Sequence, residues 1–417
     1  MERDPRTVVE TVWRLESPRL IAGLTRLVRD LSQAEDLAQE ALVEALETWP
    51  RSGVPENPGA WLRTVAKNRA FDALRRRQRT TKKYEQLAAE LRSPDETWAA
   101  DAEALDNPWG DDLLRLIFLT CHPVLSMDAR VSLILRLLGG LTTAEISRAF
   151  LVPEPTIAQR IVRAKRTLAA ARAPFELPAP AELSARYESV LQVLYLIFNE
   201  GYSATSGDRW VRKELFGDAL RMGRILASLS PEEPEVLGLA ALMELQTSRL
   251  ATRTTTEGEP ILLLDQNRAR WDRMLISRGL AALEQAERLG KILGPYCLQA
   301  AIAACHARAP RAQDTGWTQI AALYDAFVQI EPSPVVALNR AVAVGMAYGP
   351  AAGWDAVEEI SSHPALNSYH LLPSVRADFL VKLGRLEQAR TEFERAAALT
   401  QNLREREFLL RRARELS

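Results

Sequence analysis

Apolar residues recur at helical spacing along most of the chain, and they predict a protein that is almost wholly helical. The clearest stripe follows Ser32 and Glu35, which form a capping-box pair at the start of a helix. Its apolar positions are Ala34, Leu37, Ala38, Ala41, Leu42, Ala45, Leu46 and Trp49. Runs of β-branched residues are scarce, which disfavours strands. The pattern therefore predicts an all-α fold.

The opposite face of this helix is polar and mostly acidic. Its residues are Asp36, Gln39, Glu40, Glu44 and Glu47. Two interpretations fit such a face: it is solvated surface, or it is a docking face for a basic partner. The periodicity alone favours solvated surface.

A second helix is predicted from about Ala60 to Arg79, after a loop rich in Pro, Gly and Asn over residues 50–59. Its expected buried side consists of Trp61, Leu62, Val65, Ala66, Phe71 and Leu74. Residues 62–83 contain nine Lys/Arg and a single acidic residue, Asp72. The expected cations are Arg63, Lys67, Arg69, Arg75, Arg76 and Arg77.

This basic helix is interpreted as a nucleic-acid contact, with a solvated helix end as the alternative. Arg and Lys bind phosphates and release counterions, which gives affinity independent of sequence. Asn57, Trp61 and Asn68 lie beside the cations and are suited to hold an unstacked base. An acidic stretch follows over residues 84–112, with a short helix expected near Trp98–Leu105. We expect it to act as a tether that rests against the basic segments when DNA is absent.

A helix-turn-helix is predicted between residues 142 and 172. Thr142 and Glu145 form a second capping box, and Glu154 and Pro155 suit the first turn of the following helix. The inward stripe of that helix is Ile157, Ile161, Ala164 and Leu168, and its outward residues are Thr156, Ala158, Gln159, Arg160 and Arg163. The basic outward face favours insertion into a DNA major groove over an ordinary helical hairpin.

Residues 180–417 show helix-length segments separated by Gly/Pro breaks. Gly349 and Gly384 lie 35 positions apart, and each precedes an Ala-rich amphipathic segment. This spacing predicts stacked helix pairs. The segment from Gly384 to Arg390, with Phe393, Ala396 and Ala397, resembles the second helix of a tetratricopeptide repeat.

Two polar segments in this part are left with open alternatives. Asn199, Glu200 and Tyr202 form a contact to the preceding domains or a ligand pocket, unless Gly201 simply caps a helix in the left-handed conformation. The segment 265–268, with Trp271 and Asp272, is a second polar cluster of the same kind.

Composition excludes several functional classes. The net charge is −1, so only the local charge distribution points to nucleic acid. Three cysteines and four histidines, without metal-ligand spacing, predict no metal site, no cofactor and a reducing cytoplasm. No signal peptide, membrane span, nucleotide-binding loop or catalytic constellation is recognised, so we expect no enzyme activity and no membrane partner.

These motifs together resemble the extracytoplasmic-function group of the sigma-70 family, the promoter-recognition subunits of bacterial RNA polymerase. The phrase at 34–40, the Asn-Pro-Gly-Ala-Trp-Leu at 57–62, the Asn68-to-Asp72 segment and the helix at 156–165 carry the resemblance. The tail and the segment at 196–205 resemble the subgroup with a large helical C-terminal extension.

The resemblance implies a domain order and roles for the candidate residues. Residues 5–82 would form sigma region 2, 83–112 an acidic linker, 113–173 sigma region 4 and 180–417 a tetratricopeptide-like extension. Asp36, Gln39 and Glu40 would bind the clamp of the largest polymerase subunit, and region 4 would approach the flap. Promoter DNA would be bound at the −10 element by Asn57, Trp61, Arg63, Lys67, Asn68, Arg69, Asp72, Arg75 and Arg76, and at the −35 element by Thr156, Ala158, Gln159, Arg160, Arg163 and Lys165.

The expected function is that of an alternative sigma factor regulated by its own extension, through a signalling protein or a small ligand. A helix-turn-helix regulator with a tetratricopeptide sensor is the alternative, and a pure scaffold is a third class. The apolar Ala158 departs from the basic or hydroxyl residue common at this position in the family, so the promoter sequence is not transferable. The inducing signal, the sign of regulation and the oligomeric state stay open.

Overall fold

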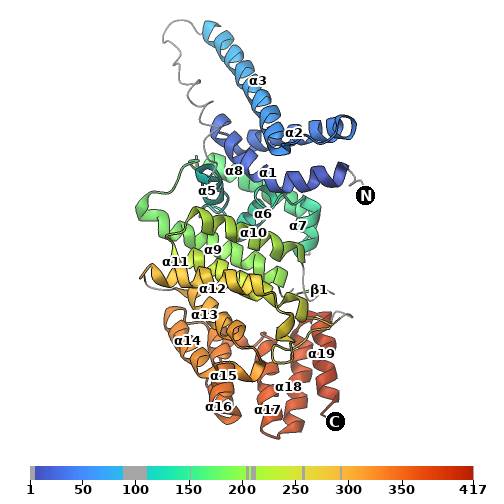
Figure 1. The fold of residues 1–417 in the computed structure, drawn as a ribbon, viewed down its shortest axis with the longest axis vertical. Helices are drawn as coiled ribbons and strands as arrows, with labels where there is room; N and C mark the ends of the chain where they lie inside the picture. Colours follow the sequence, from blue (N-terminus) through green and yellow to red (C-terminus); the bar gives the residue numbers. More distant parts are fainter. Residues whose placement is uncertain are drawn as a thin grey trace. The chain divides into compact units, whose positions relative to one another are not determined.

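Helices form nearly all of the described chain, as the sequence predicts. A computed structural model of the protein describes residues 5–87, 110–150, 152–202, 206–207, 213–255, 259–291 and 294–416. The chain divides into two compact units, Met1–Val193 and Leu194–Ser417. The first unit contains α1 (Pro5–Val28), α2 (Leu31–Ser52), α3 (Pro58–Leu87), α5 (Gly110–Thr120), α6 (Met127–Leu137), α7 (Thr143–Phe150), α8 (Glu154–Ala170) and the first part of α9 (Pro180–Tyr202) (Figure 1).

Helices α1, α2 and α3 pack against one another at the N-terminal end of the first unit. The buried face of α2 includes the small residues Ala34, Ala38 and Ala41. Trp49 near the end of α2 is fully buried, and its ring meets that of Trp61 edge-on at 5.4 Å. The predicted apolar stripe of α2 is therefore confirmed, except that Leu42 is half-buried and Leu46 is exposed.

The predicted start of α2 is wrong. Asp30, and not Ser32, caps the helix, because its carboxylate accepts a hydrogen bond from the Gln33 N–H at 2.9 Å. Helix α2 also continues past Pro50 to Ser52, into the segment expected to be a loop.

The helix predicted to be basic is α3. It begins at Pro58 and reaches Leu87, beyond the end predicted at Arg79. The acidic tether proposed for residues 84–112 lies largely outside the described residues, as does the short helix expected near Trp98–Leu105. Its last residue, Asp112, is described and belongs to α5, where it pairs with Arg26 at 3.2 Å and Arg115 at 2.7 Å. The C-terminal end of the acidic stretch is thus anchored on a helix.

The remaining helices of the first unit surround α6. Leu133, Ile134, Leu135 and Leu137 on α6 are completely buried, and α6 packs against α5, α7 and α8. The predicted inward stripe of α8 is confirmed, because Ile157, Ile161, Ala164 and Leu168 are all buried.

The second unit is a succession of helices, most of them with short connections; the segment from 249 to 272, between α11 and α12, is long and contains the 3-10 turns Leu250–Thr252 and Arg268–Arg270. It contains the last part of α9, α10 (Lys213–Leu229), α11 (Pro234–Ser248), α12 (Arg273–Arg288), α13 (Pro295–Arg308), α14 (Trp317–Ile330), α15 (Pro334–Tyr348), α16 (Pro350–Ile360), α17 (Leu371–Lys382), α18 (Leu386–Leu399) and α19 (Leu403–Arg414). Two-residue strands β1 (Ser206–Gly207) and β2 (Gln401–Asn402) pair in parallel.

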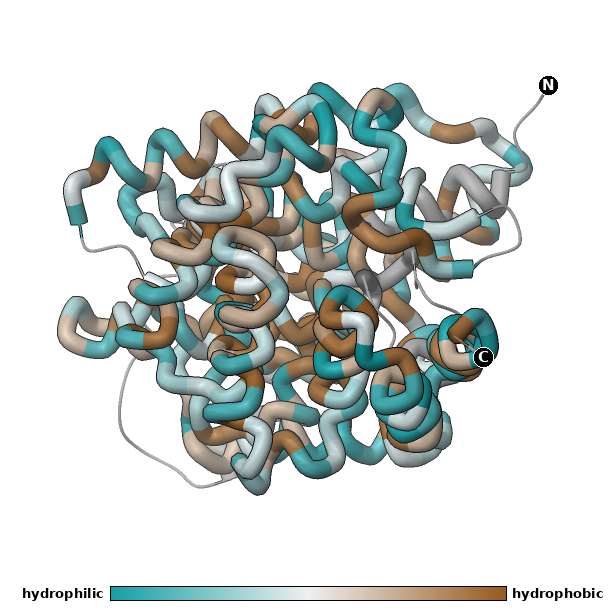
Figure 2. Tube along the Cα trace, turned by 90° about the horizontal axis from the view of Figure 1, so that it is seen from below, coloured by the Kyte–Doolittle hydropathy of each residue, from teal (hydrophilic) through white to brown (hydrophobic). Residues whose placement is uncertain are grey.

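Helices from α13 onward pack mainly on their neighbours in sequence, and successive groups have separate small cores. Phe327 belongs to the first core, Phe379 to the next and Phe393 to the last. Figure 2 shows apolar and polar residues alternating along the helices, as expected for helices with one buried face. Nearest-neighbour burial of this kind is the physical basis of helical repeat proteins.

The glycines that defined the predicted period lie at equivalent turns. Gly349 (φ 103°) separates α15 from α16, and Gly384 (φ 77°) separates α17 from α18. Both require a backbone conformation that side chains disfavour. By contrast, Gly201 does not cap a helix, because it is a buried residue inside α9 without a positive φ.

Candidate polymerase and promoter interfaces

The three residues predicted to bind polymerase lie on the solvent side of α2. Asp36 and Glu40 are exposed, and Gln39 is half-exposed. The Glu40 carboxylate accepts a hydrogen bond from Arg69 of α3 at 2.7 Å. The predicted docking face is therefore accessible, but one of its charges is already engaged.

The residues predicted for the −10 element line α3 from its first turn. Asn57 caps this helix, since its Oδ1 accepts a hydrogen bond from the Ala60 N–H at 3.0 Å. Trp61 is half-buried against Trp49, so its ring is oriented by the core. Asn68 is exposed and lies near the middle of the helix.

The cations of α3 differ in their surroundings. Arg63 lies 3.5 Å from Glu16 of α1, and Lys67 lies over the ring of Phe71. Arg75 and Arg76 are exposed, with Arg75 3.8 Å from Asp72 one turn earlier. The side chain of Arg77 lies outside the described residues. Exposed pairs of this kind contribute little to stability, so their guanidinium groups remain able to exchange a carboxylate for a phosphate.

A groove of about 390 Å³ runs between α2 and α3. It brings Glu40, a predicted polymerase residue, next to Asn68, Arg69, Asp72 and Arg76, all predicted for DNA. Arg69 is held at the groove by Glu40 and Glu44, each at 2.7 Å. The two predicted sites thus share one groove, which periodicity did not reveal.

Helices α7 and α8 form the predicted helix-turn-helix. The Thr142–Glu145 capping box is confirmed: the Thr142 N–H donates to the Glu145 carboxylate at 2.8 Å, and the Glu145 N–H donates to the Thr142 hydroxyl at 3.2 Å. The Thr143 hydroxyl donates to Glu154 at 2.9 Å and so ties the starts of the two helices together.

Most of the residues predicted for the −35 element lie on the solvent-facing side of the first turns of α8. Gln159 and Arg163 are exposed, and Thr156 and Ala158 are half-exposed. Arg160 pairs with Asp128 of α6 at 2.9 Å. This face presents amide and guanidinium groups within the first two turns, as base readout in the major groove requires.

Comparison with known families decides what these helices are. Residues 12–80 match Sigma-70 region 2, and residues 115–168 match Sigma-70, region 4. The chain belongs to the sigma-70 family. It is a sigma factor that binds RNA polymerase core and promoter DNA and directs promoter-specific transcription.

Two further comparisons include the C-terminal part of this sigma factor. Residues 186–287 match a family of unknown function, DUF6596. An uncharacterised protein of Rhizobium meliloti (strain 1021) is 42% identical over 394 residues, which cover 94% of this chain and 92% of that protein. The similarity therefore includes the extension as well as the sigma regions. No solved structure matches the chain.

A buried carboxylate joins region 2 to region 4 of the sigma factor. Glu35 on α2 is 5% exposed, and its Oε1 accepts a hydrogen bond from Arg136 of α6 at 2.9 Å. Its Oε2 pairs with Lys165 of α8. Sequence reasoning assigned Glu35 to a cap and Lys165 to DNA, because a contact between residues so far apart in sequence leaves no periodic signal.

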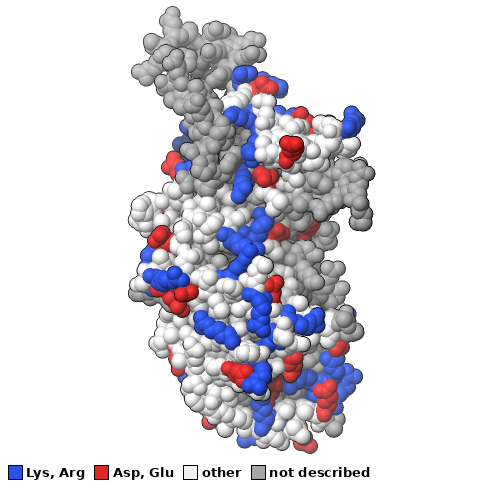
Figure 3. All heavy atoms as spheres, viewed as in Figure 1, with Lys and Arg blue, Asp and Glu red and all other residues white. Residues whose placement is uncertain are grey.

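The described surface does not form one uniform positive field. On the face drawn in Figure 3, acidic side chains adjoin several of the basic ones. The pairs of Arg69 with Glu40 and of Arg160 with Asp128 are examples within the sigma regions. Mutual neutralisation of this kind limits non-specific attraction to DNA.

Of the first polar segment predicted in the extension, only the side chain of Asn199 is described; those of Glu200 and Tyr202 are not. The second segment, 265–268 with Trp271 and Asp272, is described, and Gln266, Arg268 and Trp271 are buried. Asn199 hydrogen-bonds Tyr195, whose hydroxyl donates to Gln299 at 2.7 Å. Burial raises the pKa of Tyr195. Asn199 thus belongs to a polar chain that reaches α13.

Burial governs the titration of the cysteines. It raises the pKa of Cys121 to about 12, and it also raises the pKa values of Cys297 and Cys305. All three thiols are therefore protonated at neutral pH and unreactive. Among the described residues, no group of three or more His, Cys, Asp or Glu side chains is arranged to hold a metal ion.

The described helices also include none with the length and apolar character needed to cross a membrane.

Proposed function

We propose that this sigma factor belongs to the extracytoplasmic-function group and acts at the nucleoid in the bacterial cytoplasm. The observation that carries the proposal is the content of the first unit, where the helices matched to region 2 and region 4 account for most of the described residues. Only residues 88–109 separate α3 from α5, which leaves no room for the longer regions of housekeeping sigma factors.

In this proposal Asp36, Gln39 and Glu40 bind the clamp of the largest polymerase subunit. The solvent exposure of Asp36 and Glu40 on a rigid helix supports the assignment. Helix α3 then holds the opened −10 element, α8 reads the −35 element, and region 4 approaches the flap. The sigma factor contributes positioning and electrostatics, and it has no catalytic step of its own.

We further propose that the second unit is a tetratricopeptide-like domain that regulates the sigma regions. The equivalent turns at Gly349 and Gly384 and the separate core of each helix group support this assignment. Such domains bind peptides or small ligands on a surface made by stacked helices. The match to region 2 disfavours a stand-alone regulator, because region 2 serves polymerase.

The polymerase contact is tested with the exposed carboxylate of α2. Changing Asp36 to Ala is expected to reduce binding to core polymerase about tenfold, because a charged contact is lost at an interface. Binding is measured by fluorescence titration of the full-length chain with core polymerase. Glu56→Ala, at an exposed position before α3, is the control and leaves the affinity unchanged.

The regulatory role is tested by transcription in vitro on a promoter library. The full-length chain and a version that ends after Val193, where the first unit ends, are compared with the same core polymerase. A changed yield or promoter choice supports the proposal. Identical profiles, in a truncated chain whose helix content is intact, would remove it.

A further inference from the structure

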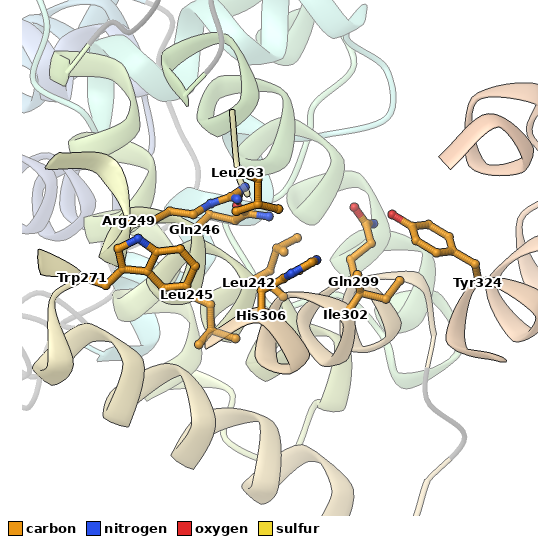
Figure 4. Close-up of a pocket in the computed structure, with 11 residues that line it drawn as sticks. Leu242, Leu245, Gln246, Arg249, Leu263, Trp271, Gln299, Ile302, His306 and Tyr324 are labelled. Atoms are coloured by element: carbon orange, nitrogen blue, oxygen red, sulfur yellow. Dashed lines mark hydrogen bonds between the residues drawn. The ribbon is translucent and has the colours of Figure 1, made fainter. Parts of the chain in front are cut away.

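A cavity of about 200 Å³ lies among α11, α13 and α14 of the second unit. Leu242 and Leu245 of α11 and Ile302 of α13 form its apolar walls, and each is at most 8% exposed. Figure 4 shows polar side chains converging on the same space. Because a dry cavity of about 150 Å³ holds benzene, this one has room for a single ring with a small substituent.

Two buried ring nitrogens at this cavity have no partner. Trp271 is 4% exposed, and its Nε1–H donates to no acceptor. The Nδ1 atom of His306 is buried without a hydrogen bond as well. Buried polar groups are rarely unsatisfied in native proteins, because each one costs free energy. Since both residues line the cavity, a bound molecule is the natural partner for both atoms.

The charge around the cavity is positive. Arg249 lines it, with a guanidinium that donates to Gln246, and Arg268 lies behind Trp271 with its guanidinium carbon 5.1 Å from the ring centre. Arg268 is itself 4% exposed and donates to the backbone oxygen of His306 at 2.9 Å. None of the eleven described residues that line the cavity is acidic.

The imidazole of His306 adds no charge to this field at neutral pH. Burial, reinforced by Arg249 and Arg268, lowers the pKa of His306 to about 3. A neutral imidazole has one N–H donor and one acceptor nitrogen. The cavity therefore combines fixed cations, a free indole donor and a neutral imidazole with apolar walls.

We propose that this cavity binds a small planar carboxylic acid in its anionic form. The carboxylate lies between the Arg249 guanidinium and the Trp271 N–H, and the planar body lies between the apolar side chains of α11 and α13. Arg binds carboxylates through paired N–H donors, which fixes their orientation. A cation is repelled by the two guanidinium groups, and an inorganic anion leaves the apolar walls unoccupied.

The polar chain described above connects this cavity to α9. Gln299 lines the cavity and accepts a hydrogen bond from Tyr195, which Asn199 also contacts. A bound acid would therefore contact Gln299, which accepts a hydrogen bond from Tyr195 of α9. Any effect on transcription rests on the proposed function, whereas binding does not, so the test measures binding alone.

Isothermal titration calorimetry of the full-length chain with benzoate, benzyl alcohol and benzylamine tests the charge requirement. These probes share a ring and differ in charge. Benzoate is expected to bind at least about tenfold more tightly than benzyl alcohol, and benzylamine is expected not to bind. Equal binding of benzoate and benzyl alcohol overturns the proposal, as does an absence of benzoate binding up to about 10 mM.

Variants then locate the site. Trp271→Phe removes the donor at nearly constant shape, and Arg249→Met removes the charge; each should weaken benzoate binding about tenfold. Ala303→Leu fills the cavity and should abolish binding. Arg288→Met, at an exposed position on α12, is the matched control.

Circular dichroism and thermal melting establish that each variant is folded. If Ala303→Leu does not fold, the two substitutions at Trp271 and Arg249 decide the question. Unchanged benzoate affinity in both places the binding elsewhere and refutes the assignment. Inorganic phosphate that binds as tightly as benzoate refutes the requirement for a planar body.

Discussion

The protonation state of a buried residue in this sigma factor cannot be predicted from its neighbours in sequence. His306 is a clear case, because it lies in an Ala-rich helix that suggests ordinary packing. Its surroundings include the guanidinium groups of Arg249 and Arg268 and the ring of Trp317 at 5.1 Å. Its protonation state is consequently set by residues far away along the chain.

The stability of the protein should depend on pH through His306. Its pKa is lowered from 6.5 to about 3, so the unfolded chain binds a proton that the folded chain excludes. Above pH 6.5 the imidazole is neutral in both states and does not affect the free energy of unfolding. As the pH falls from 6.5 toward 3, protonation of the unfolded chain lowers the free energy of unfolding. Urea unfolding at about pH 7 and about pH 5 should show a smaller decrease in His306→Gln than in the parent chain. An equal decrease in both would contradict this account.

Arg160 should determine one base of the −35 element. Its guanidinium is half-exposed and lies 2.9 Å from Asp128, so it is pre-positioned at the outer side of α8. Arg160→Ala should cost about 1–3 kcal/mol at a single base position. Binding to a set of −35 duplexes with single substitutions measures this. Arg166→Ala, on an exposed part of the same helix, should instead weaken all duplexes alike.

At the level of helices, close contacts depend on residues without a side chain. Gly345 of α15 and Gly353 of α16 contact each other directly, and the ring of Phe379 from α17 lies against both. A Cβ at Gly353 would lie 2.5 Å from Cζ of Phe379 and 2.7 Å from Cα of Gly345. The three helices can therefore meet only where both glycines are present.

Gly353→Ala should destabilise the second unit by about 1–3 kcal/mol through overpacking. Ala351→Ser, at an exposed position of α16, is expected to change the free energy of unfolding by less than about 0.5 kcal/mol. Adding Phe379→Leu to Gly353→Ala should restore part of the loss, because the smaller side chain vacates the contact. Chemical denaturation of the three variants measures these differences.

Helix existence and burial could be read from the sequence, since they follow local periodicity. The stripe from Ile157 to Leu168 and the Thr142–Glu145 cap are confirmed. The helix limits were less accurate: Asp30 replaces Ser32 as the cap, and α3 passes Arg79. These limits depend on tertiary contacts that periodicity does not encode.

The candidate sites could be predicted only in part. The outward residues of α2, α3 and α8 are where the sequence placed them, because each lies opposite an apolar stripe. Their engagement with one another was not predictable. The sequence marked Trp271 as part of a polar cluster but gave no sign that His306, Arg249 and Gln299 lie around the same cavity. The ion pairs and the cavity form between segments that are distant in sequence, and the periodicity of a single sequence does not predict contacts between such segments.

At the scale of the whole sigma portion, Glu35 makes the two matched regions one folded body. Glu35→Gln should leave Arg136 and Lys165 without their counter-charge. Because these side chains are 23% and 16% exposed, we expect a loss of about 2 kcal/mol, below the value for fully buried pairs. Hydrogen exchange should rise in α2 and α8 together.

Glu47→Gln is the control for this change, since Glu47 is exposed on the same helix. It should alter neither stability nor exchange. If Glu35→Gln accelerated exchange in α2 alone, the carboxylate would be a local feature of region 2 and not a connection between the regions.

The sharing of Arg69 between Glu40 and Glu44 has a thermodynamic consequence. A macromolecule that binds Glu40 of α2 competes with the ion pair between Glu40 and Arg69 of α3, and leaves Arg69 paired with Glu44 alone. Linkage then requires that capture of Arg69 by a nucleic acid strengthen, by the same factor, the affinity of Glu40 for its own acceptor. If Glu40 binds polymerase and Arg69 binds DNA as proposed, each of the two binding events strengthens the other.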